Sequence, residues 1–306
     1  MAARSNKGRR ITIVAFVAIL ALGGALTWLG RDHLQFLLAF ESLGRNAQGY
    51  REYRHRQTGI VFVSLPGGTF EFGTPLEEAE WLRAEYEGWS VDAGVRAESV
   101  RPFLIAKYEV TSAEWEAGKG REPPPSGGHG VPHAASWSDC REFCTRVGLA
   151  LPTEIEWEYA CRAGTTGSYA GGGDLDDLGW YGGNSGGEVR AVGQKKPNGF
   201  GLHDMHGNLW EWCEDRGSGF LSGLDSTAFV SLRNPSLDEP DFHRWRRVIR
   251  GGGWITLARG CRSASRADES PTSSTDVGFR PVWRSGAGDD LQSRDSGRSD
   301  IVSGRR

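Results

Sequence analysis

The sequence predicts an α+β domain with an irregular backbone. Two short amphipathic helices are followed, beyond residue 165, by short β-prone runs that glycine turns separate, an order typical of α+β folds. Glycine makes up 44 of 306 residues with no three-residue period, which excludes collagen and indicates many turns. The 12 tryptophans supply large apolar side chains that can hold such a chain around a core. Helical bundles are disfavoured because glycine weakens helices, and solenoids because no repeat is present.

The N-terminal segment predicts a membrane anchor. Residues 1–10 carry four basic side chains and no acid, which predicts a cytoplasmic basic tail, and residues 11–30 contain no charge. Twenty residues at the helical rise span about 30 Å, the thickness of a hydrocarbon core. We therefore expect a single-pass protein of the cytoplasmic membrane, with its main domain on the outer, periplasmic or extracellular side. A signal peptide cleaved within 21–25 is the alternative, but the apolar run continues to Leu29.

Two further segments flank the globular part. Residues 31–57 are expected to form a juxtamembrane helix and linker, whose apolar side chains lie on the bilayer or pack on the domain. Arginines in this segment weaken the charge argument for the orientation: Arg31, Arg45, Arg51, Arg54 and Arg56. Residues 286–306 are rich in Gly, Ser, Asp and Arg, which predicts a disordered tail. The globular domain is therefore placed at about 58–285.

Three β-prone runs open this domain. Residues 60–65 are β-branched and aromatic and end at the Pro-Gly-Gly of 66–68. Residues 69–72 alternate like a half-buried strand, and 103–110 is a third strand candidate. The early part of the domain is thus expected to be sheet.

Two helices are predicted from their capping residues. The first covers 136–147, where Ser136 and Asp139 make a capping pair. The second starts after Thr153, and Glu156 completes a capping box three residues later. In both, apolar side chains recur at three and four residue spacing, which predicts one buried face.

An acidic turn follows the helices. Asp204 and Glu211 bracket a Gly207–Asn208 turn, and Ca²⁺ prefers such mixtures of carboxylates and backbone carbonyls. On spacing alone, a solvated acidic turn is the better interpretation. Trp210 lies directly beside Glu211 and is a candidate ligand-binding side chain.

A basic block covers 246–283. Arg247 and Arg250 would lie on opposite sides of a regular strand, and Arg262 follows in the same block. Such a strand could offer a basic rim to an anionic or peptide ligand, with Arg250 and Arg262 as candidate ligand-binding residues. The alternative is a set of solvated residues that discourages edge pairing.

Composition and missing motifs exclude several classes of function. The net charge is −3 and the isoelectric point about 6.2, which argues against a nucleic-acid partner. No phosphate loop and no Gly-x-Ser-x-Gly elbow is present. His129 and His133 flank a proline, so a helical pair of iron ligands is implausible, and we reject an iron oxygenase.

Several blocks together resemble the sulfatase-modifying-factor family, typified by the formylglycine-generating enzyme. The similar stretches keep the family's order over about 220 residues: 66–70, 107–111, 151–160, 207–212, 250–252 and 278–280. The resemblance implies an irregular, glycine-rich relative of the C-type lectin fold. It also implies that 58–285 is a sulfatase-modifying-factor domain.

The resemblance implies an oxidase that holds copper(I) with two cysteines. The second of them matches Cys261, whereas the first matches Thr256, and a hydroxyl cannot replace a thiolate for a soft ion. The family's neighbouring serine, histidine and tyrosine are replaced here by Gly253, Leu257 and Gly260. The departures gather at the chemistry while scaffold motifs persist, so loss of the oxidase reaction is expected. Copper bound by Cys261 with a recruited thiol is the remaining alternative for a catalytic role of this residue.

The resemblance also implies a structural calcium ion. Its ligands would be the side chains of Asp204 and Glu211 and the carbonyls of Gly207 and Leu209. A second family site would start at 184–185, but its other ligands lie in a stretch that is missing here. We therefore expect one calcium ion at most.

Five cysteines leave an odd thiol outside the cytoplasm: Cys140, Cys144, Cys161, Cys213 and Cys261. The disulfides that the resemblance implies do not transfer, because the partners of Cys144 and Cys161 match Pro281 and Arg266. Cys140 and Cys144 are interpreted as small core side chains at helical spacing.

Two functions follow as hypotheses. The first is a membrane-anchored, non-catalytic member that binds a protein or peptide partner, with a sulfatase among the candidates; carbohydrate is a further option because tryptophans stack on sugars. The second is an active oxidase that converts a sulfatase cysteine to formylglycine with Cys261. A scaffold protein without a small ligand is the third interpretation.

Overall fold

A computed structural model describes residues 33–86, 93–122, 130–217, 246–273 and 275–285. The contacts divide the chain into two units, 1–40 with 285–306, and 41–284. In the first unit, residues 33–39 are helical and Phe36 stacks on Phe40 at a centroid distance of 5.1 Å. The candidate site lies in the second unit, which the following paragraphs describe.

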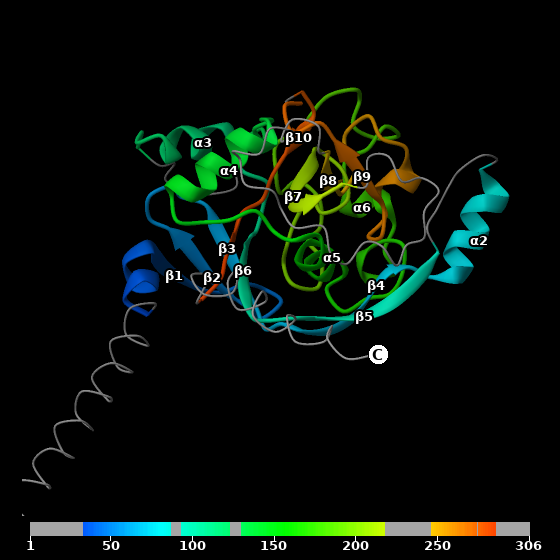
Figure 1. The fold of residues 1–306 in the computed structure, drawn as a ribbon, viewed down its shortest axis with the longest axis horizontal. Helices are drawn as coiled ribbons and strands as arrows, with labels where there is room; N and C mark the ends of the chain where they lie inside the picture. Colours follow the sequence, from blue (N-terminus) through cyan, green and yellow to red (C-terminus); the bar gives the residue numbers. More distant parts are fainter. Residues whose placement is uncertain (1–32, 87–92, 123–129, 218–245, 274, 286–306) are drawn as a thin grey trace, which may run out of the picture. The chain divides into compact units, whose positions relative to one another are not determined.

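The largest sheet has five strands in the order β1-β2-β3-β6-β11, and Figure 1 labels the first four of them. Its strands are β1 (Phe40–Arg45), β2 (Arg51–His55), β3 (Val61–Leu65), β6 (Phe103–Ala106) and β11 (Val282–Trp283). The pairings β2–β3, β3–β6 and β6–β11 are antiparallel, and Ile105 lies opposite both Val63 and Val282. β3 and β6 are apolar and almost entirely buried, as central strands should be.

The second sheet has four strands in the order β10-β7-β8-β9. They are β7 (Trp210–Arg216), β8 (Arg247–Arg250), β9 (Arg266–Glu269) and β10 (Val277–Gly278). β10 pairs with β7 in parallel, whereas β7–β8 and β8–β9 are antiparallel. β8 is therefore an interior strand, and all four of its residues are buried.

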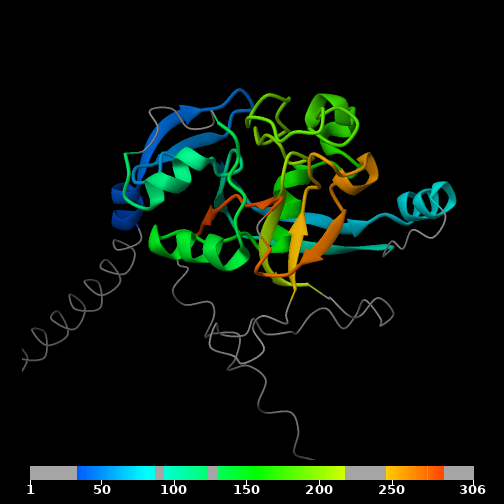
Figure 2. The same ribbon diagram turned by 90° about the horizontal axis from the view of Figure 1, so that it is seen from above.

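A two-stranded ribbon of β4 (Gly68–Thr74) and β5 (Gly94–Val100) forms a third, separate sheet. The helix α2 (Leu76–Glu85) follows β4, and Figure 2 shows it at the far end of the ribbon. Arg96 lies 4.5 Å above the ring of Phe72, its partner across the ribbon.

The helices begin at capping residues. The described helices of the remaining part of this unit are α3 (Ser112–Gly118), α4 (Trp137–Arg146), α5 (Glu154–Arg162) and α6 (Leu175–Leu178), with short 3₁₀ turns at η1 (Ala170–Gly172) and η4 (Ala258–Cys261). The predicted capping pair of α4 and the predicted capping box of α5 are both confirmed. α3 has a further box, between Thr111 and Glu114, which the sequence reasoning did not identify.

The core lies around α5. Its cluster includes side chains of β3, β6, α5, β7 and β8, so α5 contributes buried side chains alongside strands of both large sheets. Trp157 of α5 has no exposed surface, and Trp115 stacks on Phe143 where α3 and α4 pack together. The prediction that tryptophans anchor an irregular chain fits this core.

One expectation needs correction, and three fall outside the described residues. Within 31–57, residues 40–45 and 51–55 are strands, so a helix and linker is wrong for them. Pairing of Glu52, Tyr53 and Arg54 with β3 overrides the local pattern. The predicted anchor, basic tail and C-terminal tail lie outside the described residues. In the described ranges, no helix is both long and apolar enough to span a membrane.

Candidate functional site

The Gly207–Asn208 turn lies tightly against the backbone of Trp180. A Cβ atom at Gly207 would lie 2.1 Å from the Trp180 carbonyl oxygen, and the φ of Gly207 is +124°, so glycine is required there. The Asn208 amide nitrogen donates to the same carbonyl at 2.7 Å. The Asn208 side chain donates to Glu109 Oε2 at 2.6 Å and accepts from the Arg190 amide. The turn is thus a buried junction, and not the solvated acidic turn that its spacing alone suggests.

Glu211 forms a buried ion pair with Arg280. The guanidinium donates to both carboxylate oxygens, with Nε at 2.7 Å from Oε2 and Nη2 at 2.6 Å from Oε1. Trp157 Nε1 donates to Oε2 at 2.7 Å. Burial alone would lower the pKa of Arg280, but the Glu211 charge and its hydrogen bonds raise it above its ordinary value. Both residues have no exposed surface, so this pair joins α5, β7 and the 280 region internally.

Two more carboxyl groups are buried near this pair. Burial and the charges of Asp204 and Glu211 raise the pKa of Glu109 well above its usual range. Burial raises the pKa of Asp204 to about 6, although the Gly193 amide donates to its Oδ2 at 2.7 Å. Asp204 Oδ1 is buried and has no hydrogen-bond partner among the described residues.

The predicted calcium ligands do not fit as a set. Asp204 has a carboxylate oxygen to offer, but both Glu211 oxygens already accept hydrogen bonds, and Arg280 neutralises the charge. The Leu209 amide donates to Glu109 Oε1, so a second carboxylate binds the backbone of this turn. Within the described ranges, no cluster of three or more His, Cys, Asp or Glu side chains is arranged to hold a metal.

Cys261 is enclosed beneath the Gly251–Gly253 segment. A Cβ atom at Gly252 would lie 2.5 Å from Cys261 Sγ, and Cys261 has no exposed surface. Burial raises the pKa of the Cys261 thiol to about 12, so the thiol stays protonated near neutral pH. His206 Nδ1 lies 2.8 Å from the Cys261 carbonyl, and its Nε2 accepts from the Ala170 amide. This histidine therefore holds the Cys261 backbone.

Thr256 is half-buried and lies in the turn that follows this segment. Its Oγ1 accepts from the Gly253 amide at 2.9 Å, which closes a short turn over residues 253–256. The Thr256 carbonyl accepts from the Gly182 amide, so the turn is also tied to the 180 loop. A hydroxyl here does not fit copper(I), which prefers thiolates, and it leaves Cys261 as the one sulfur of the two expected ligands.

The other cysteines offer no thiolate either. All five cysteines are buried and none is in a disulfide. Cys161 Sγ lies 3.7 Å from His206 Nε2, and burial raises its pKa to about 12. Cys140 and Cys144 lie on the buried face of α4, as predicted.

Arg250 and Arg262 do not lie where a ligand could reach them. The guanidinium of Arg250 pairs with Glu158 and donates to the Ser263 carbonyl, and Arg250 has no exposed surface. Arg262 Nη1 lies 2.7 Å from Glu78 Oε1, and the residue is 3% exposed. The prediction of a basic rim is wrong, and so is the alternative of solvated edge residues, because β8 is a buried interior strand. Glu158 of α5 neutralises Arg250, and Glu78 of α2 neutralises Arg262.

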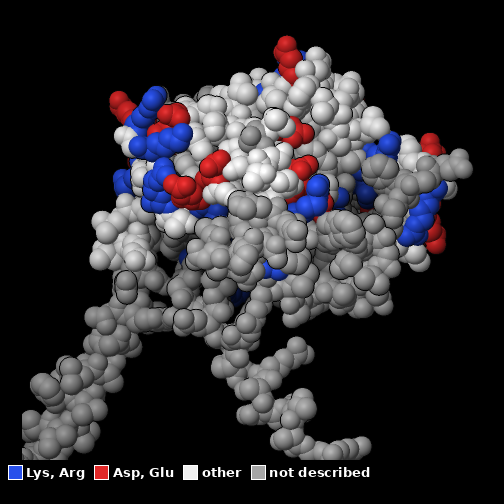
Figure 3. Space-filling view, turned by 45° about the horizontal axis from the view of Figure 1, so that its top comes forward, with Lys and Arg blue, Asp and Glu red and all other residues white. Residues whose placement is uncertain are grey.

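Trp210 does lie beside the Thr256 segment. It is half-buried, and a Cβ atom at Gly253 would lie 3.2 Å from its Cδ1. Ile255 and Leu257, on either side of Thr256, are 59% and 56% exposed. These two exposed aliphatic side chains make the accessible part of the candidate site apolar. In the view of Figure 3, most charged side chains of the described surface lie toward its left and right sides.

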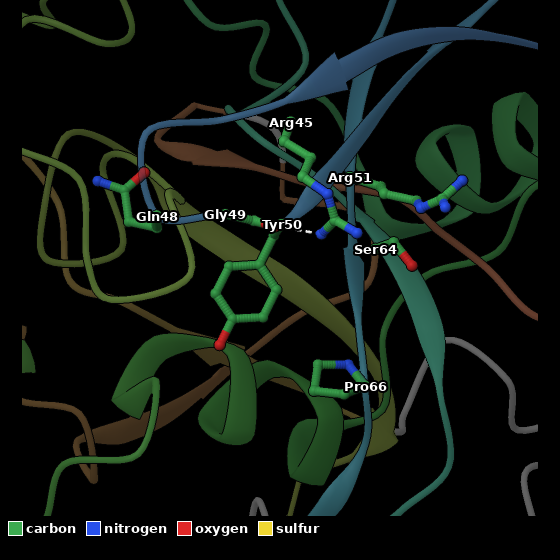
Figure 4. A pocket seen from close by; sticks show the side chains of 7 residues that line it. All are labelled: Arg45, Gln48, Gly49, Tyr50, Arg51, Ser64 and Pro66. Carbon is green, nitrogen blue, oxygen red and sulfur yellow. Dashed lines mark hydrogen bonds between the residues drawn. The ribbon is translucent and has the colours of Figure 1, made fainter.

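A separate hollow of about 340 Å³ lies at the β1–β2 turn (Figure 4). Its lining combines two arginines with a serine and an aromatic ring: Arg45, Gln48, Gly49, Tyr50, Arg51, Ser64 and Pro66. The Arg45 guanidinium donates to the Gly49 carbonyl, so part of its hydrogen-bonding capacity serves the turn.

Sequence reasoning missed the partners that hold the site together. Glu109 and Arg280 lie in stretches that carried the family resemblance. Spacing does not reveal that Glu109 binds Leu209, about 100 residues away, or that Arg280 binds Glu211, about 70 residues away. A buried charge needs an opposite charge. An acid and an arginine within otherwise apolar motifs were therefore the available signal that each has a buried partner.

Comparison with known proteins identifies the family. The profile described as sulfatase-modifying factor enzyme 1-like domain matches residues 48–285. The formylglycine-generating enzyme of Thermomonospora curvata is 34% identical over 291 residues, covering 71% of this chain and 91% of that protein. That of Streptomyces coelicolor is 33% identical over 192 residues, but the match spans only 58% of its length. The inactive C-alpha-formylglycine-generating enzyme 2 of Bos taurus is 32% identical, covering 75% and 89% of the two chains.

Solved structures show the same fold. PvdO from Pseudomonas aeruginosa matches with a TM-score of 0.55 and 23% identity over 79% of this chain and 97% of that one. Treponema denticola variable protein 1 matches with a TM-score of 0.54 and 21% identity over 76% and 99%. These neighbours are of the formylglycine-generating-enzyme and C-type-lectin-like kind, which confirms a mixed α/β fold of that type. On its profile match and its relatives, the chain belongs to the family of sulfatase-modifying factor enzyme 1-like domains.

Proposed function

We propose that this protein is a non-catalytic member of its family that binds a peptide segment of a protein partner without oxidising it. The observation that carries the proposal is the state of the two positions expected to hold copper. Cys261 is an enclosed thiol with a pKa of about 12, and Thr256 is a hydroxyl already bonded to the Gly253 amide.

The chemistry of the oxidase needs what these positions lack. In the absence of a metal, a thiol with a pKa of about 12 is almost wholly protonated at pH 7, so Cys261 must lose its proton before it can ligate copper(I) or act as a nucleophile. Reaching Cys261 would also require the Gly252 backbone to move, since that backbone covers the sulfur. A relative in cattle named inactive C-alpha-formylglycine-generating enzyme 2 supports the proposal, because a fold can persist without its reaction.

The surface above the buried thiol suits recognition. Ile255 and Leu257 project from a turn that is fixed by Thr256, and Trp210 lies directly behind it. Exposed aliphatic side chains on a backbone held by hydrogen bonds favour an apolar side chain of a peptide ligand. A sulfatase is the first partner to test, because relatives are named formylglycine-generating enzymes.

The site of action follows from the N-terminal sequence. We place residues 11–30 in the cytoplasmic membrane and the domain on its outer side, because a basic flank precedes an uncharged run of twenty residues. Protease added to intact spheroplasts should digest the domain, while a cytoplasmic protein of the same cells stays intact.

The deciding experiment is a turnover assay on the full chain in detergent. The protein is incubated with copper(I), oxygen, a reductant and a peptide containing Cys-x-Pro-x-Arg, and mass spectrometry follows formylglycine. We expect no conversion, together with retention of the peptide in a binding assay that Ile255→Ser and Leu257→Ser weaken.

A second variant sharpens this assay. Thr256→Cys restores a thiol on the exposed turn and should increase the copper(I) bound per chain. Conversion by the unaltered chain that Cys261→Ser abolishes would instead establish an oxidase and refute the proposal.

A further inference from the structure

The ribbon of β4 and β5 has one covered edge and one open edge. The Gly73 amide of β4 donates to Glu158, the Gly73 carbonyl accepts from Arg162, and the Gly67 carbonyl accepts from Tyr159, so α5 covers the outer edge of β4. Among the described strands, none pairs with the outer edge of β5. Figure 1 shows β5 as a long strand running along the ribbon.

Apart from its last residue, Val100, which is buried, β5 has exposed side chains on both of its faces. Residues 94–97 and 99 are exposed, Glu98 is half-buried and Val95 is 42% exposed. The hydrogen bonds between described residues tie the backbone of 94–99 to β4 alone. An exposed strand with a row of unpaired amides and carbonyls is a template for a further strand.

The charges on β5 indicate which strand fits. Arg96 Nε lies 2.6 Å from Glu98 Oε1 within the chain, and the two side chains are 50% and 26% exposed. They stand on one face of the strand, with Ala97 between them on the other face. If a second strand of the same sequence runs in the opposite direction with Ala97 opposite Ala97, each Arg96 lies opposite a Glu98.

We propose that a second copy of this chain adds to the outer edge of β5, antiparallel and with Ala97 opposite Ala97. In this register each Arg96 faces the Glu98 of the other copy, so the two pairs make a ring of four alternating charges. The result is a continuous four-stranded sheet, β4-β5-β5-β4, with two-fold symmetry. The inference is independent of the function proposed for the Thr256 segment.

Other registers are less favourable. Directly opposite residues of an antiparallel pair lie on the same face of the sheet. In a two-fold symmetric pair, one residue of β5 must therefore lie opposite the same residue of the other copy. Centring on Arg96 would oppose two arginines, and centring on Glu98 would oppose two carboxylates, both of which are destabilising. The other face offers only the small side chains of Val95, Ala97 and Ser99, which do not obstruct the approach.

The association should be weak. One strand pair of seven residues buries less area than a standard interface, and exposed ion pairs add little affinity. The charge ring therefore sets the register, while backbone hydrogen bonds supply most of the attraction. Dimer content should rise with protein concentration.

Cysteine cross-linking on the full chain in detergent tests the register. Directly opposite residues in an antiparallel pair have Cα atoms about 4.5–5.5 Å apart, within the range of a disulfide. All five native cysteines are buried, so an introduced thiol at Ala97 is an accessible one. Ala97→Cys should form a disulfide-linked dimer on mild oxidation.

Val95→Cys is the matched control. It lies on the same face and is also exposed, but in the proposed register it faces Ser99, about 13 Å from its own counterpart. It should stay largely monomeric on oxidation. A mixture of Val95→Cys and Ser99→Cys chains should cross-link again, as a heterodimer.

Charge exchange gives a second readout without oxidation. Arg96→Glu and Glu98→Arg should each lower the dimer fraction seen by sedimentation, and mixing the two variants should restore it. Equal cross-linking of Ala97→Cys and Val95→Cys would overturn the register. Absence of both cross-linking and concentration-dependent sedimentation would overturn the proposal.

Discussion

Two regions on either side of β7 differ in how they use their polar groups. On one side, Glu109, Asn208, Glu211 and Arg280 are fully buried and bonded to one another or to neighbouring backbone. On the other side, residues 253–257 form an exposed turn above a single enclosed thiol, Cys261. The first region joins distant segments, and the second displays side chains to solvent.

This difference teaches which parts of the family pattern encode the fold. The motifs that carried the resemblance supply this buried network of polar side chains. Loss of a charged member would leave its partner's charge unpaired in the core. The residues that departed from the pattern lie on or below an exposed turn, where a substitution costs the scaffold little. Sequence similarity in this family therefore reports the fold more directly than the reaction.

Removal of Arg280 should have the largest effect. Arg280→Ala leaves the Glu211 carboxylate buried and unpaired, and loss of one partner from a buried pair costs about 3–5 kcal/mol. Thermal unfolding should show a large fall in Tm or loss of soluble protein.

The matched control for Arg280 is a surface pair. Arg146→Ala removes an exposed i,i+4 partner of Glu142 and should change the free energy of unfolding by about 0.5 kcal/mol or less. Similar losses for the two variants would contradict the distinction between the two regions.

Acid should destabilise the scaffold through His55. Burial lowers the pKa of this histidine from 6.5 to about 4, so the unfolded chain binds a proton between these pH values and the native chain does not. Stability is therefore lost as pH falls from 6.5 towards 4, by about 3 kcal/mol from this group.

The pH profile of His55→Gln checks this effect. Other titrating groups, including carboxyls whose raised pKa acts in the opposite sense, are shared by both chains, so the comparison isolates His55. The variant should lose less stability over this interval than the unaltered chain. Parallel profiles would contradict the assignment to His55.

Substitutions in the exposed turn should have a small effect on stability. Ile255→Ser and Leu257→Ser remove side chains that are more than half exposed, and such changes are usually within about 0.5 kcal/mol. Their unfolding curves should overlay that of the unaltered chain. A large loss would show that the turn is part of the scaffold after all.

Calcium should have the smallest effect. Since Arg280 neutralises Glu211, we expect Tm in excess EGTA to match Tm in millimolar calcium within error. A calcium-dependent rise in Tm that Asp204→Asn abolishes would restore the cation site that the sequence suggested.

Local signals predicted the local elements well. Capping residues placed α4 and α5 correctly, and the β-branched run before Pro66 placed β3. These predictions succeeded because a cap or an alternation acts over three to six residues. β1 was missed because its pairing with β2, and not its own composition, makes it a strand.

The site was predicted less well than the fold. The sequence placed Trp210, Thr256 and Cys261 in motifs, and the structure brings Trp210 to the Thr256 turn and encloses Cys261. Arg250 and Arg262 were expected at a ligand surface, but acids from α5 and α2 neutralise them in the interior. A charge count along the chain cannot show which acid will meet which arginine.

The sequence by itself determined the family, the helix starts and the replacement of one copper ligand by Thr256, because residue identity and short-range spacing suffice for each. Only the tertiary structure decided that Cys261 is an enclosed thiol, that Glu211 is held by Arg280, and that β5 keeps an open edge. Burial and ion pairing depend on segments far apart in the chain, and their free energies arise only when folding brings those segments together and removes water.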